Sequence, residues 1–483
     1  MPKSDQTIKD HTMELLDKQN VKADIITYRF STTEDTMPKV PSLAPRVRQI
    51  LPTVCASLSC LPFGLMLGWP SPTNPILMGE DSPIPISIDQ SAMIAGFLMI
   101  GNALGATHSH KIIYKAKFGI LAGAIVMTIG WILMWHAKNI FWLLGSRLLV
   151  GLGSAYGTGQ LKLYISHTCD RDLKVIQTKF ISLYVYLGIV MVYAIGPFID
   201  FRDTSMVCLL VSIAVVFLVI FLPATPVELV KDSKFNEARR VIARLKSNVN
   251  INSEISAISR SIEKKVKERN LLHIFKEPDL RNKFVVFSII VFCQQFSGLP
   301  ATIIYTQILF QEFRFPYPEY LAIAYVVIFF ICNVIGIFLM PRFDKRKVLL
   351  CSTISVILIL TTQILVIYFE VNDKYWSFTS FVVMCLYVIA HTLGLGNVPP
   401  TLINDLFTIP YRTSVANFFT AFHSILALLI TKIFQVLISQ YDIAVTFYLF
   451  LCVSVFALVF IYFAAPNEAQ CNNDVEIKCK PTT

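Results

Sequence analysis

Twelve long apolar stretches, separated by short polar segments, constrain this 483-residue chain more than any other feature. A helix that crosses a bilayer needs roughly 20 mostly apolar residues, because each residue rises about 1.5 Å through about 30 Å of hydrocarbon. Only 15% of the residues are charged, against about a quarter in a soluble domain. We therefore expect an all-α membrane protein with twelve transmembrane helices. They are predicted at 50–68, 90–107, 118–135, 141–164, 179–199, 205–223, 284–310, 321–340, 348–368, 377–402, 414–438 and 444–464.

These stretches form two groups of six, and the interval between the groups is the longest charged segment inside the chain. Apolar residues of this interval recur near helical spacing at Phe235, Ala238, Ile242 and Leu245, so we expect short amphipathic helices lying against the inner face of the membrane. The chain is accordingly divided into a cytoplasmic N-terminal tail (1–49), a first six-helix bundle (50–223), a cytoplasmic helical linker (224–283), a second six-helix bundle (284–464) and a cytoplasmic C-terminal tail (465–483).

The distribution of Lys and Arg predicts how the helices are oriented. With an even number of spans both termini lie on one side, and the short loops there hold ten basic residues against four on the other side. The positive-inside rule therefore places both termini in the cytoplasm. The first 49 residues have no apolar core before a small-residue site, so no cleaved signal peptide is expected. The longest outward loop, 69–87, is rich in Pro, and we expect a constrained exterior turn.

Several functional classes lack the residues that they need. No Cys-x-x-Cys pair or Cys/His cluster has the spacing of metal ligands, and no GxxxxGK[ST] loop is present to bind a nucleotide. No basic face with interleaved aromatic residues indicates nucleic acid, and no nucleophile, base and orienting group gather in one motif. We expect no enzyme activity, no cofactor, no metal and no obligate protein partner. The lipid bilayer is the partner that the composition indicates.

Four motifs resemble those of one family. The run CQQFSGLPATIIYTQILF (293–310) resembles the QQxSGxNxxxxYxxxIF signature that opens the seventh helix of sugar porters. The segments 145–160, 187–196 and 223–245 are similar to the fourth-helix, fifth-helix and PESPxWL motifs. The chain thus resembles the sugar-porter branch of the major facilitator superfamily over about residues 45–466, most of all insect facilitated trehalose and hexose carriers. The resemblance implies the major facilitator fold and facilitative transport of a hexose, a trehalose-like sugar or a related polyol by alternating access at the plasma membrane.

The seventh-helix motif supplies the first candidate binding residues. A solute with many hydroxyls must exchange water for protein hydrogen bonds near the middle of the membrane, and adjacent amides cannot comfortably face lipid. We therefore expect Gln294, Gln295, Ser297 and Tyr305 to line a solute cavity. The alternative is that the two amides bond neighbouring helices, as polar residues in membrane bundles often do.

The chain departs from the family at other solute positions. The SGxN amide becomes Pro300, the tenth-helix Trp becomes Pro400, the fifth-helix Gln falls at Ser182, and the eleventh-helix Asn falls at His423. Three lost hydrogen bonds would cost on the order of 2 to 4 kcal/mol, so affinity for an ordinary hexose would not survive without compensation. Ser182 and His423 stay candidate binding residues, although a lone intramembrane His more often bonds a neighbouring helix. Lys432 is a cation inside an apolar stretch, which needs a partner or marks a path.

Helix-breaking residues and charges indicate the moving parts. Gly and Pro weaken helix hydrogen bonding in the seventh and tenth spans, which permits a gate there or a kink for packing; the residues are Gly298, Pro300, Gly394, Gly396 and Pro399. The acids of two family motifs are replaced by Ala224 and His167, so the ion-pair lattice that closes the cytoplasmic side is incomplete. The remaining charges either form a partial lattice or only satisfy topology; they are Arg147, Arg342, Arg346, Asp405 and Arg412.

The energy source and two rival functions complete the predictions. Proton-coupled relatives carry a carboxylate in the first span, but residues 50–68 contain no Asp or Glu, which favours facilitated diffusion. One rival is a non-transporting sensor or scaffold derived from a sugar transporter. The other is a carrier of a different small organic solute, an anion or amine, with Lys432 or His423 as the counter-charge.

Overall fold

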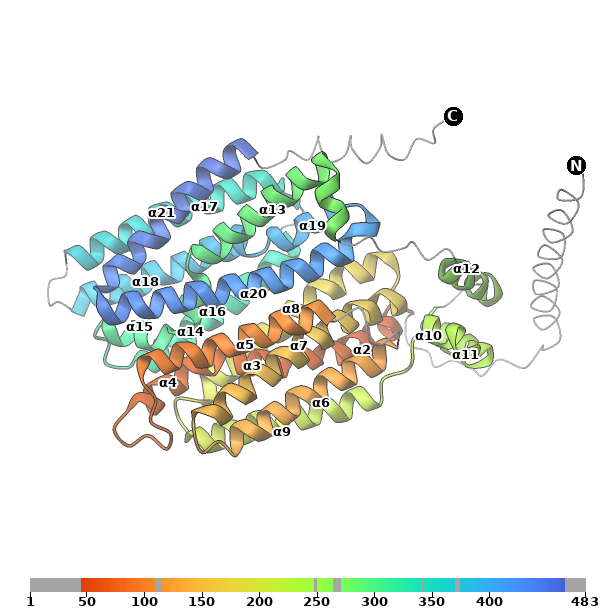
Figure 1. The fold of residues 1–483 in the computed structure, drawn as a ribbon, viewed down its shortest axis with the longest axis horizontal. Coiled ribbons are helices and arrows are strands. Elements are labelled where there is room, and N and C mark those ends of the chain that lie inside the picture. The colour runs from red at the N-terminus through yellow and green to blue at the C-terminus, as the bar shows by residue number, and fades with distance from the viewer. Residues whose placement is uncertain are drawn as a thin grey trace, which may run out of the picture.

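The computed structural model describes residues 45–108, 115–246, 250–263, 271–339, 342–369 and 374–464. Two bundles of long helices lie side by side in Figure 1, with a small group of short helices at one end. The first bundle contains α2 (Pro45–Ser57), η1 (Leu58–Cys60), α3 (Leu61–Gly68), α4 (Pro70–Met78), α5 (Ile88–His108), α6 (Ala116–Trp135), α7 (Ile140–Thr168), α8 (Arg171–Ile195) and α9 (Phe201–Ile220).

The second bundle follows a linker of short helices. The linker consists of α10 (Pro226–Lys231), α11 (Phe235–Leu245), α12 (Ile251–Glu263) and the 3-10 helix η2 (Leu271–Lys276). The second bundle contains α13 (Pro278–Phe296), α14 (Leu299–Ile304), α15 (Thr306–Glu312), α16 (Pro318–Leu339), α17 (Lys345–Tyr368), α18 (Lys374–His391), the π-helical turn η4 (Thr392–Gly396), α19 (Pro399–Leu406), α20 (Ile409–Gln440) and α21 (Ile443–Ala464).

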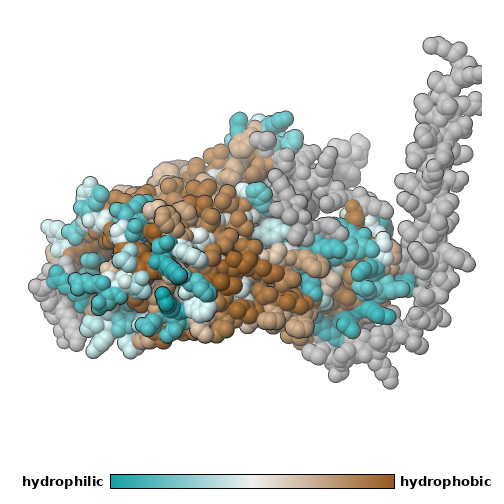
Figure 2. Space-filling model, turned by 60° about the horizontal axis from the view of Figure 1, so that its bottom comes forward, coloured by the Kyte–Doolittle hydropathy of each residue, from teal (hydrophilic) through white to brown (hydrophobic). Residues whose placement is uncertain are grey.

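Eleven helical segments in the described part of the chain are long and apolar enough to cross a membrane. They do not include α5, a 21-residue helix that begins with Asp89 in its first turn and packs between α7 and α20. With α5 the two bundles hold six long spans each, which agrees with the prediction. Figure 2 shows a continuous hydrophobic band between two more hydrophilic ends, as lipid exposure of the side walls requires. We call the end next to α10–α12 the linker end and the opposite end the α4 end (Figure 1).

Glycines let the helices of the first bundle approach within backbone contact. A Cβ at Gly101 of α5 would lie 2.1 Å from the carbonyl oxygen of Leu148 on α7, and one at Gly151 of α7 would lie 2.1 Å from that of Leu98. Gly64 of α3 faces α8 in the same way. Small residues at helix contacts are typical of membrane bundles, because dispersion between closely packed backbones replaces the missing hydrophobic driving force.

The prediction that residues 69–87 form an exterior turn is partly wrong. The first half of this segment is the helix α4, which begins with Pro70 directly after α3. Pro is tolerated in the first turn of a helix because the N–H groups of that turn have no acceptor within the helix, so the absence of one costs nothing. Ser71 and Asn74 on α4 are buried, so this helix is part of the bundle rather than an external cap.

The linker helices pack on one another. Ala238, Ile242 and Leu245 of α11 are buried, and the first two share a small core with Leu229 and Ile255 from α10 and α12. The amphipathic pattern of α11 is therefore used in helix–helix contacts, which corrects the expectation that its apolar face lies on the membrane.

Polar contacts attach the linker to the first bundle. Thr225 and Glu228 form a capping box at the start of α10, and the Glu228 carboxylate also accepts from the backbone N–H of Lys117 (3.3 Å). Burial raises the pKa of Glu228, although these hydrogen bonds oppose that effect. Lys246 Nζ lies 2.6 Å from Glu254 and 3.3 Å from Asp170 at the start of α8. These contacts join the linker to the first bundle.

Candidate functional site

The seventh span is broken where the sequence predicts it. α13 ends at Phe296, and Gly298 has φ of 106°, a left-handed conformation that favours glycine. A Cβ there would lie 2.4 Å from the Phe450 ring of α21, so the contact also excludes a side chain. Pro300 falls in the first turn of α14, where no N–H donor is needed.

Gln294 and Gln295 stand on the last turn of α13 and point inward. Their side chains are 6% and 2% exposed, so neither amide faces lipid. Gln294 Nε2 donates to the carbonyl oxygen of Gly396 (2.9 Å). The amide oxygens of both glutamines are buried and have no hydrogen-bond partner among the described residues. A buried acceptor without a donor costs about 1 to 3 kcal/mol, so these oxygens favour a bound donor.

A second break, in the tenth span, meets the first. α18 ends at His391, η4 follows, and α19 begins at Pro399. Ser352 of α17 satisfies backbone groups at the break, because its hydroxyl donates to Ala390 O (2.7 Å) and accepts from Leu395 N (3.1 Å). A Cβ at Gly394 would lie 2.1 Å from the Ser352 side chain. The predicted breaks at Gly298 and at Gly394–Pro399 are therefore both present, and Gln294 joins them through Gly396.

His391 is a polar residue of this centre that sequence reasoning missed. It is 1% exposed, and its Nε2 lies 2.7 Å from Ser297 Oγ. Since the Ser297 hydroxyl donates to Gln294 O (2.8 Å), the histidine Nε2–H must donate to Ser297 Oγ. Nδ1 is then an acceptor, and it has no partner among the described residues. The available signal was a polar residue one turn before the Gly394 and Gly396 pair.

Tyr387 supports Ser297 from the other side. Its hydroxyl donates to Ser297 O (2.8 Å), one turn before His391 on α18. The predicted residue Ser297 therefore has contacts through both its hydroxyl and its carbonyl oxygen. Gln294, Gln295, Ser297 and His391 form what we call the amide centre, in which three acceptor atoms are unoccupied.

Tyr305 lies away from the amide centre, where α14 meets α15. Its hydroxyl is 3.4 Å from Ser91 Oγ on α5, and its ring stacks on Phe434 of α20 (centroids 5.5 Å apart). Three more hydrogen bonds join the bundles in this region: the Tyr193 hydroxyl donates to Ile303 O and contacts Thr306 Oγ1 (3.0 Å), and Gln307 N donates to Ser71 Oγ (3.2 Å). Tyr305 thus belongs to the contact between the bundles near the α4 end.

Ser182 and His423 do not join the amide centre through any contact of the described residues. Ser182 is exposed on α8. One turn later on the same face, Tyr186 packs edge to face on Phe329 of α16 (4.8 Å) and so contacts the second bundle. His423 is half-buried on α20 with its ring 5.4 Å from Phe419.

Part of the predicted charge lattice forms, within the second bundle. Asp405 pairs with Lys345 (2.5 Å). Arg412 donates to the carbonyl oxygens of Asn404 (2.7 Å) and Phe407 (2.8 Å). In a separate contact Arg346 donates to Tyr462 O (2.5 Å), and Arg342 is exposed.

Arg147 lies outside this lattice, which corrects the prediction that grouped it with Asp405. α7 starts at the α4 end, so a residue two turns into it cannot reach the linker end. Its guanidinium is fully buried, donates to Met66 O (2.8 Å) and lies over the Trp69 ring (4.7 Å).

Comparisons with known proteins identify the family of this chain. The family model described as "Sugar (and other) transporter" matches residues 87–470. The facilitated trehalose transporter Tret1 of Aedes aegypti is 24% identical over 99% of this chain, which spans 61% of that relative's length. Tret1 of Bombyx mori is 23% identical over 89% of this chain and 86% of its own.

Solved structures show the same fold at low identity. An inward open conformation of the xylose transporter XylE from E. coli has a TM-score of 0.73 at 14% identity, covering 88% of this chain and 99% of that one. The proton:xylose symporter XylE bound to 6-bromo-6-deoxy-D-glucose has a TM-score of 0.68 at 16% identity, over 88% and 97%. This chain therefore belongs to the sugar transporter family and is a multi-pass membrane protein with the major facilitator fold.

Proposed function

We propose that the chain is a facilitative carrier of a sugar, a hexose or trehalose-like sugar, or of a related polyol, and that it works by alternating access in the plasma membrane. The observation that carries this proposal is the amide centre, whose free acceptors are Gln294 Oε1, Gln295 Oε1 and His391 Nδ1. Hydroxyl groups donate to such atoms, and a sugar offers several of them on one small body. The linker end is then cytoplasmic, as the positive-inside rule predicts.

Position as well as chemistry supports this role. The centre lies where two interrupted helices meet, and unwound backbone at membrane depth is tolerated where protein or a water-filled path surrounds it. Interrupted helices at a midplane site are a recurring design of secondary transporters. A solute that binds Gln294 or His391 therefore touches segments whose hydrogen bonding is already weakened, at Gly298 and at Gly394.

The surroundings of Arg147 support transport without ion coupling. Coupling requires a titratable group whose protonation is linked to solute binding. Residues 50–68 have no Asp or Glu, and the Arg147 guanidinium bonds a backbone carbonyl and an aromatic face instead of a carboxylate. We therefore propose uniport driven by the solute gradient alone.

Neither rival function gains support from a particular contact. A carrier of organic anions needs a counter-charge, but Lys432 is paired with Asp89. His423 packs near Phe419 and has no acidic side chain among its described contacts. A sensor without transport is separated from a carrier by counterflow, which binding alone cannot produce.

Flux across reconstituted vesicles tests the proposal. Purified protein in liposomes should show saturable counterflow of labelled trehalose, glucose or a polyol that does not depend on a proton gradient. Each of Gln294→Ala and Gln295→Ala removes an acceptor worth about 0.5 to 1.5 kcal/mol, so the half-saturation concentration should rise roughly two- to twelvefold. Gln363→Ala is the matched control, because it removes an equally buried amide from α17, away from both helix breaks.

Two results would contradict the proposal. One is normal counterflow by the double Gln294→Ala, Gln295→Ala variant. The other is binding of sugars by the wild-type protein without counterflow of any of them.

A further inference from the structure

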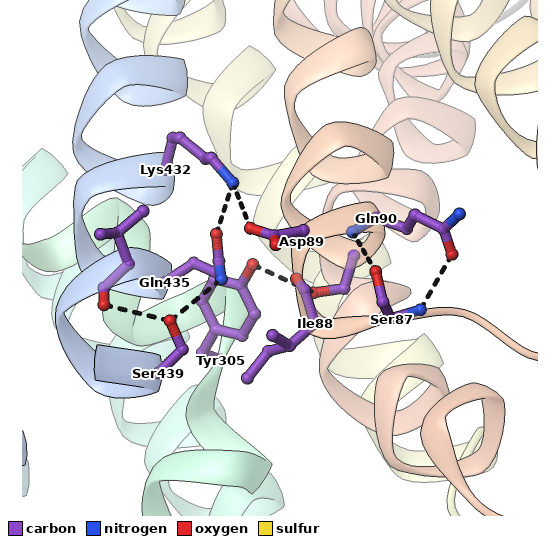
Figure 3. A network of polar contacts seen from close by, with 10 residues as sticks. Ser87, Ile88, Asp89, Gln90, Tyr305, Lys432, Gln435 and Ser439 are labelled. Carbon is purple, nitrogen blue, oxygen red and sulfur yellow. Dashed lines mark hydrogen bonds and ion pairs between the residues drawn. The ribbon is translucent and has the colours of Figure 1, made fainter. Parts of the chain in front are cut away.

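Lys432 lies within the apolar span of α20, and its partner belongs to the other bundle. Its Nζ lies 2.8 Å from Asp89 Oδ1 and 2.6 Å from Gln435 Oε1 (Figure 3). Asp89 stands in the first turn of α5, where the helix dipole favours an acid. A cation in a membrane helix is costly unless it is paired. The ion pair therefore satisfies Lys432 only while α5 and α20 are together at the α4 end.

The ion pair is continuous with the Tyr305 contact. Figure 3 shows Lys432 and Gln435 on α20 beside Asp89 on α5, with Tyr305 close to them. Phe434 of α20 carries the ring on which Tyr305 stacks, and the Tyr305 hydroxyl contacts Ser91, two residues after Asp89. The segment between Lys432 and Gln435 thus holds both α5 and the α14–α15 junction.

Toward the middle of the bundle, the contact between α5 and α20 is made by apolar and uncharged polar residues instead of an ion pair. A Cβ at Gly96 would lie 3.4 Å from the Leu428 side chain, and Ser424 donates to Asn102 (3.0 Å). Asn102 and Ser424 are buried, whereas the Asp89 and Lys432 side chains are 72% and 43% exposed. Water therefore reaches the ion pair, and such pairs exchange for hydrated ions at small cost. It is the most easily opened of these contacts.

At the linker end, basic side chains of the two bundles lie near each other. Burial and the charge of Arg412 on α20 lower the pKa of Lys174 on α8. Two acids of this region have other partners, since Asp405 pairs with Lys345 and Glu277 accepts from Tyr411 (3.2 Å). The α4 end differs, because the ion pair there joins opposite charges of the two bundles.

We propose that Asp89 and Lys432 form an ion-pair latch across the two bundles that keeps the outward entrance closed, so that the carrier rests open toward the linker end. The proposal rests on the alternating access of the proposed function, but no solute is needed to observe it. Solute arriving from outside meets a latch that must separate before Tyr305 and α5 can part.

Cysteine labelling measures the latch directly. Ser91 is fully buried behind the ion pair, so in a Ser91→Cys chain a hydrophilic maleimide reacts only when the α4 end opens. Asp89→Asn and Lys432→Gln should each raise the labelling rate of purified protein about threefold or more. The exchanged pair Asp89→Lys with Lys432→Asp should restore slow labelling. Labelling of the chain that keeps Ser91 is subtracted, because Cys351 and Cys452 are exposed.

A salt titration and the control variant Asp279→Asn separate the loss of this ion pair from a general destabilisation of the protein. At about 1 M salt the Debye length is about 3 Å, so labelling of the Ser91→Cys chain should rise toward that of Lys432→Gln, which should respond less. Asp279→Asn breaks an ion pair within α13 and should leave labelling unchanged. Slow labelling of both single variants would overturn the latch, and so would fast labelling of the exchanged pair. If the labelling rates change as expected but the protein shows no sugar counterflow, the proposed function is rejected and the latch is not.

Discussion

Each of the two bundles contains six spans, but their central helices differ. In the first bundle α5 and α7 are continuous over 21 and 29 residues, and they touch through glycines whose neighbours are backbone atoms. In the second bundle the spans α13–α14 and α18–α19 are interrupted at Gly298 and at Thr392–Gly396, whereas the first span of the first bundle passes through the short 3-10 turn at Leu58–Cys60. The glycines of the first bundle therefore serve close helix packing, and those of the second bundle stand at helix breaks.

Open buried acceptors occur in both bundles, since Asn74 Oδ1 and Gln177 Oε1 of the first also lack partners among the described residues, but those of the amide centre stand beside helix breaks. The amide centre belongs entirely to the second bundle and leaves acceptors of Gln294, Gln295 and His391 open. In the first bundle the polar residue Asn102 donates to Ser154 (3.3 Å) and accepts from Ser424. Binding chemistry and helix breaks therefore lie together, because the backbone groups freed at a break need polar neighbours.

The largest effect is expected from filling a backbone contact of the first bundle. In Gly151→Ala the new methyl would lie 2.1 Å from Leu98 O, and a backbone atom cannot move aside as a side chain can. Overpacking of this kind costs about 1 to 3 kcal/mol or more, so the melting temperature of the detergent-solubilised protein should fall clearly.

Gly145→Ala on the same helix is the matched control. Nothing lies within 4 Å of the added methyl, and replacing a helical Gly gains up to about 1 kcal/mol. Equal melting temperatures for the two variants would refute the account of the first bundle as a body closed by backbone contacts.

A smaller effect is expected at the break of the second bundle. Gly298→Ala forces a φ of 106° on a residue with a Cβ, which costs about 1 to 2 kcal/mol, and adds a clash with the Phe450 ring. Because a ring can shift, the loss of stability should be less than for Gly151→Ala, whereas counterflow should fall more. Melting and flux assays on both variants compare the two bundles directly.

A double variant separates the cost of the positive φ at Gly298 from the cost of the clash with the Phe450 ring. In a Phe450→Leu background the clash is reduced, so Gly298→Ala should cost at least about 0.5 kcal/mol less there than in the native background. Equal costs in both backgrounds would assign the whole effect to the backbone conformation.

The spans and breaks were predictable because they depend on local chemistry. A run of apolar residues must be buried or face lipid wherever it lies, and Gly298, Gly394 and Pro399 weaken a helix in any context. Gln294 and Gln295 were predicted to point inward because an amide in lipid is costly, and both are buried. Each of these predictions needs only a short window of sequence.

The failures involve contacts between distant residues. Asp89 and Lys432 lie 343 positions apart, so the sequence shows that Lys432 needs a partner but not which one. Arg147 was grouped with Asp405 by motif, although its position two turns into α7 places it near Met66. His391 was missed because a single histidine in an apolar span has no pattern of its own.

The smallest effect is expected at the connection that joins the two breaks. His391→Ala removes one donor from Ser297 Oγ, whose hydroxyl still bonds Gln294 O, so the loss is about 1 kcal/mol and the half-saturation concentration for sugar should rise a few-fold. His391→Gln keeps an N–H near Ser297 and also offers an acceptor oxygen in place of Nδ1, so it should restore part of the affinity. Tyr387→Phe removes a bond to the Ser297 carbonyl and should lower the melting temperature with less effect on half-saturation. If His391→Gln and His391→Ala raise half-saturation equally, the Gln side chain replaces neither role of the imidazole, so both the donor to Ser297 and the acceptor Nδ1 require the histidine ring.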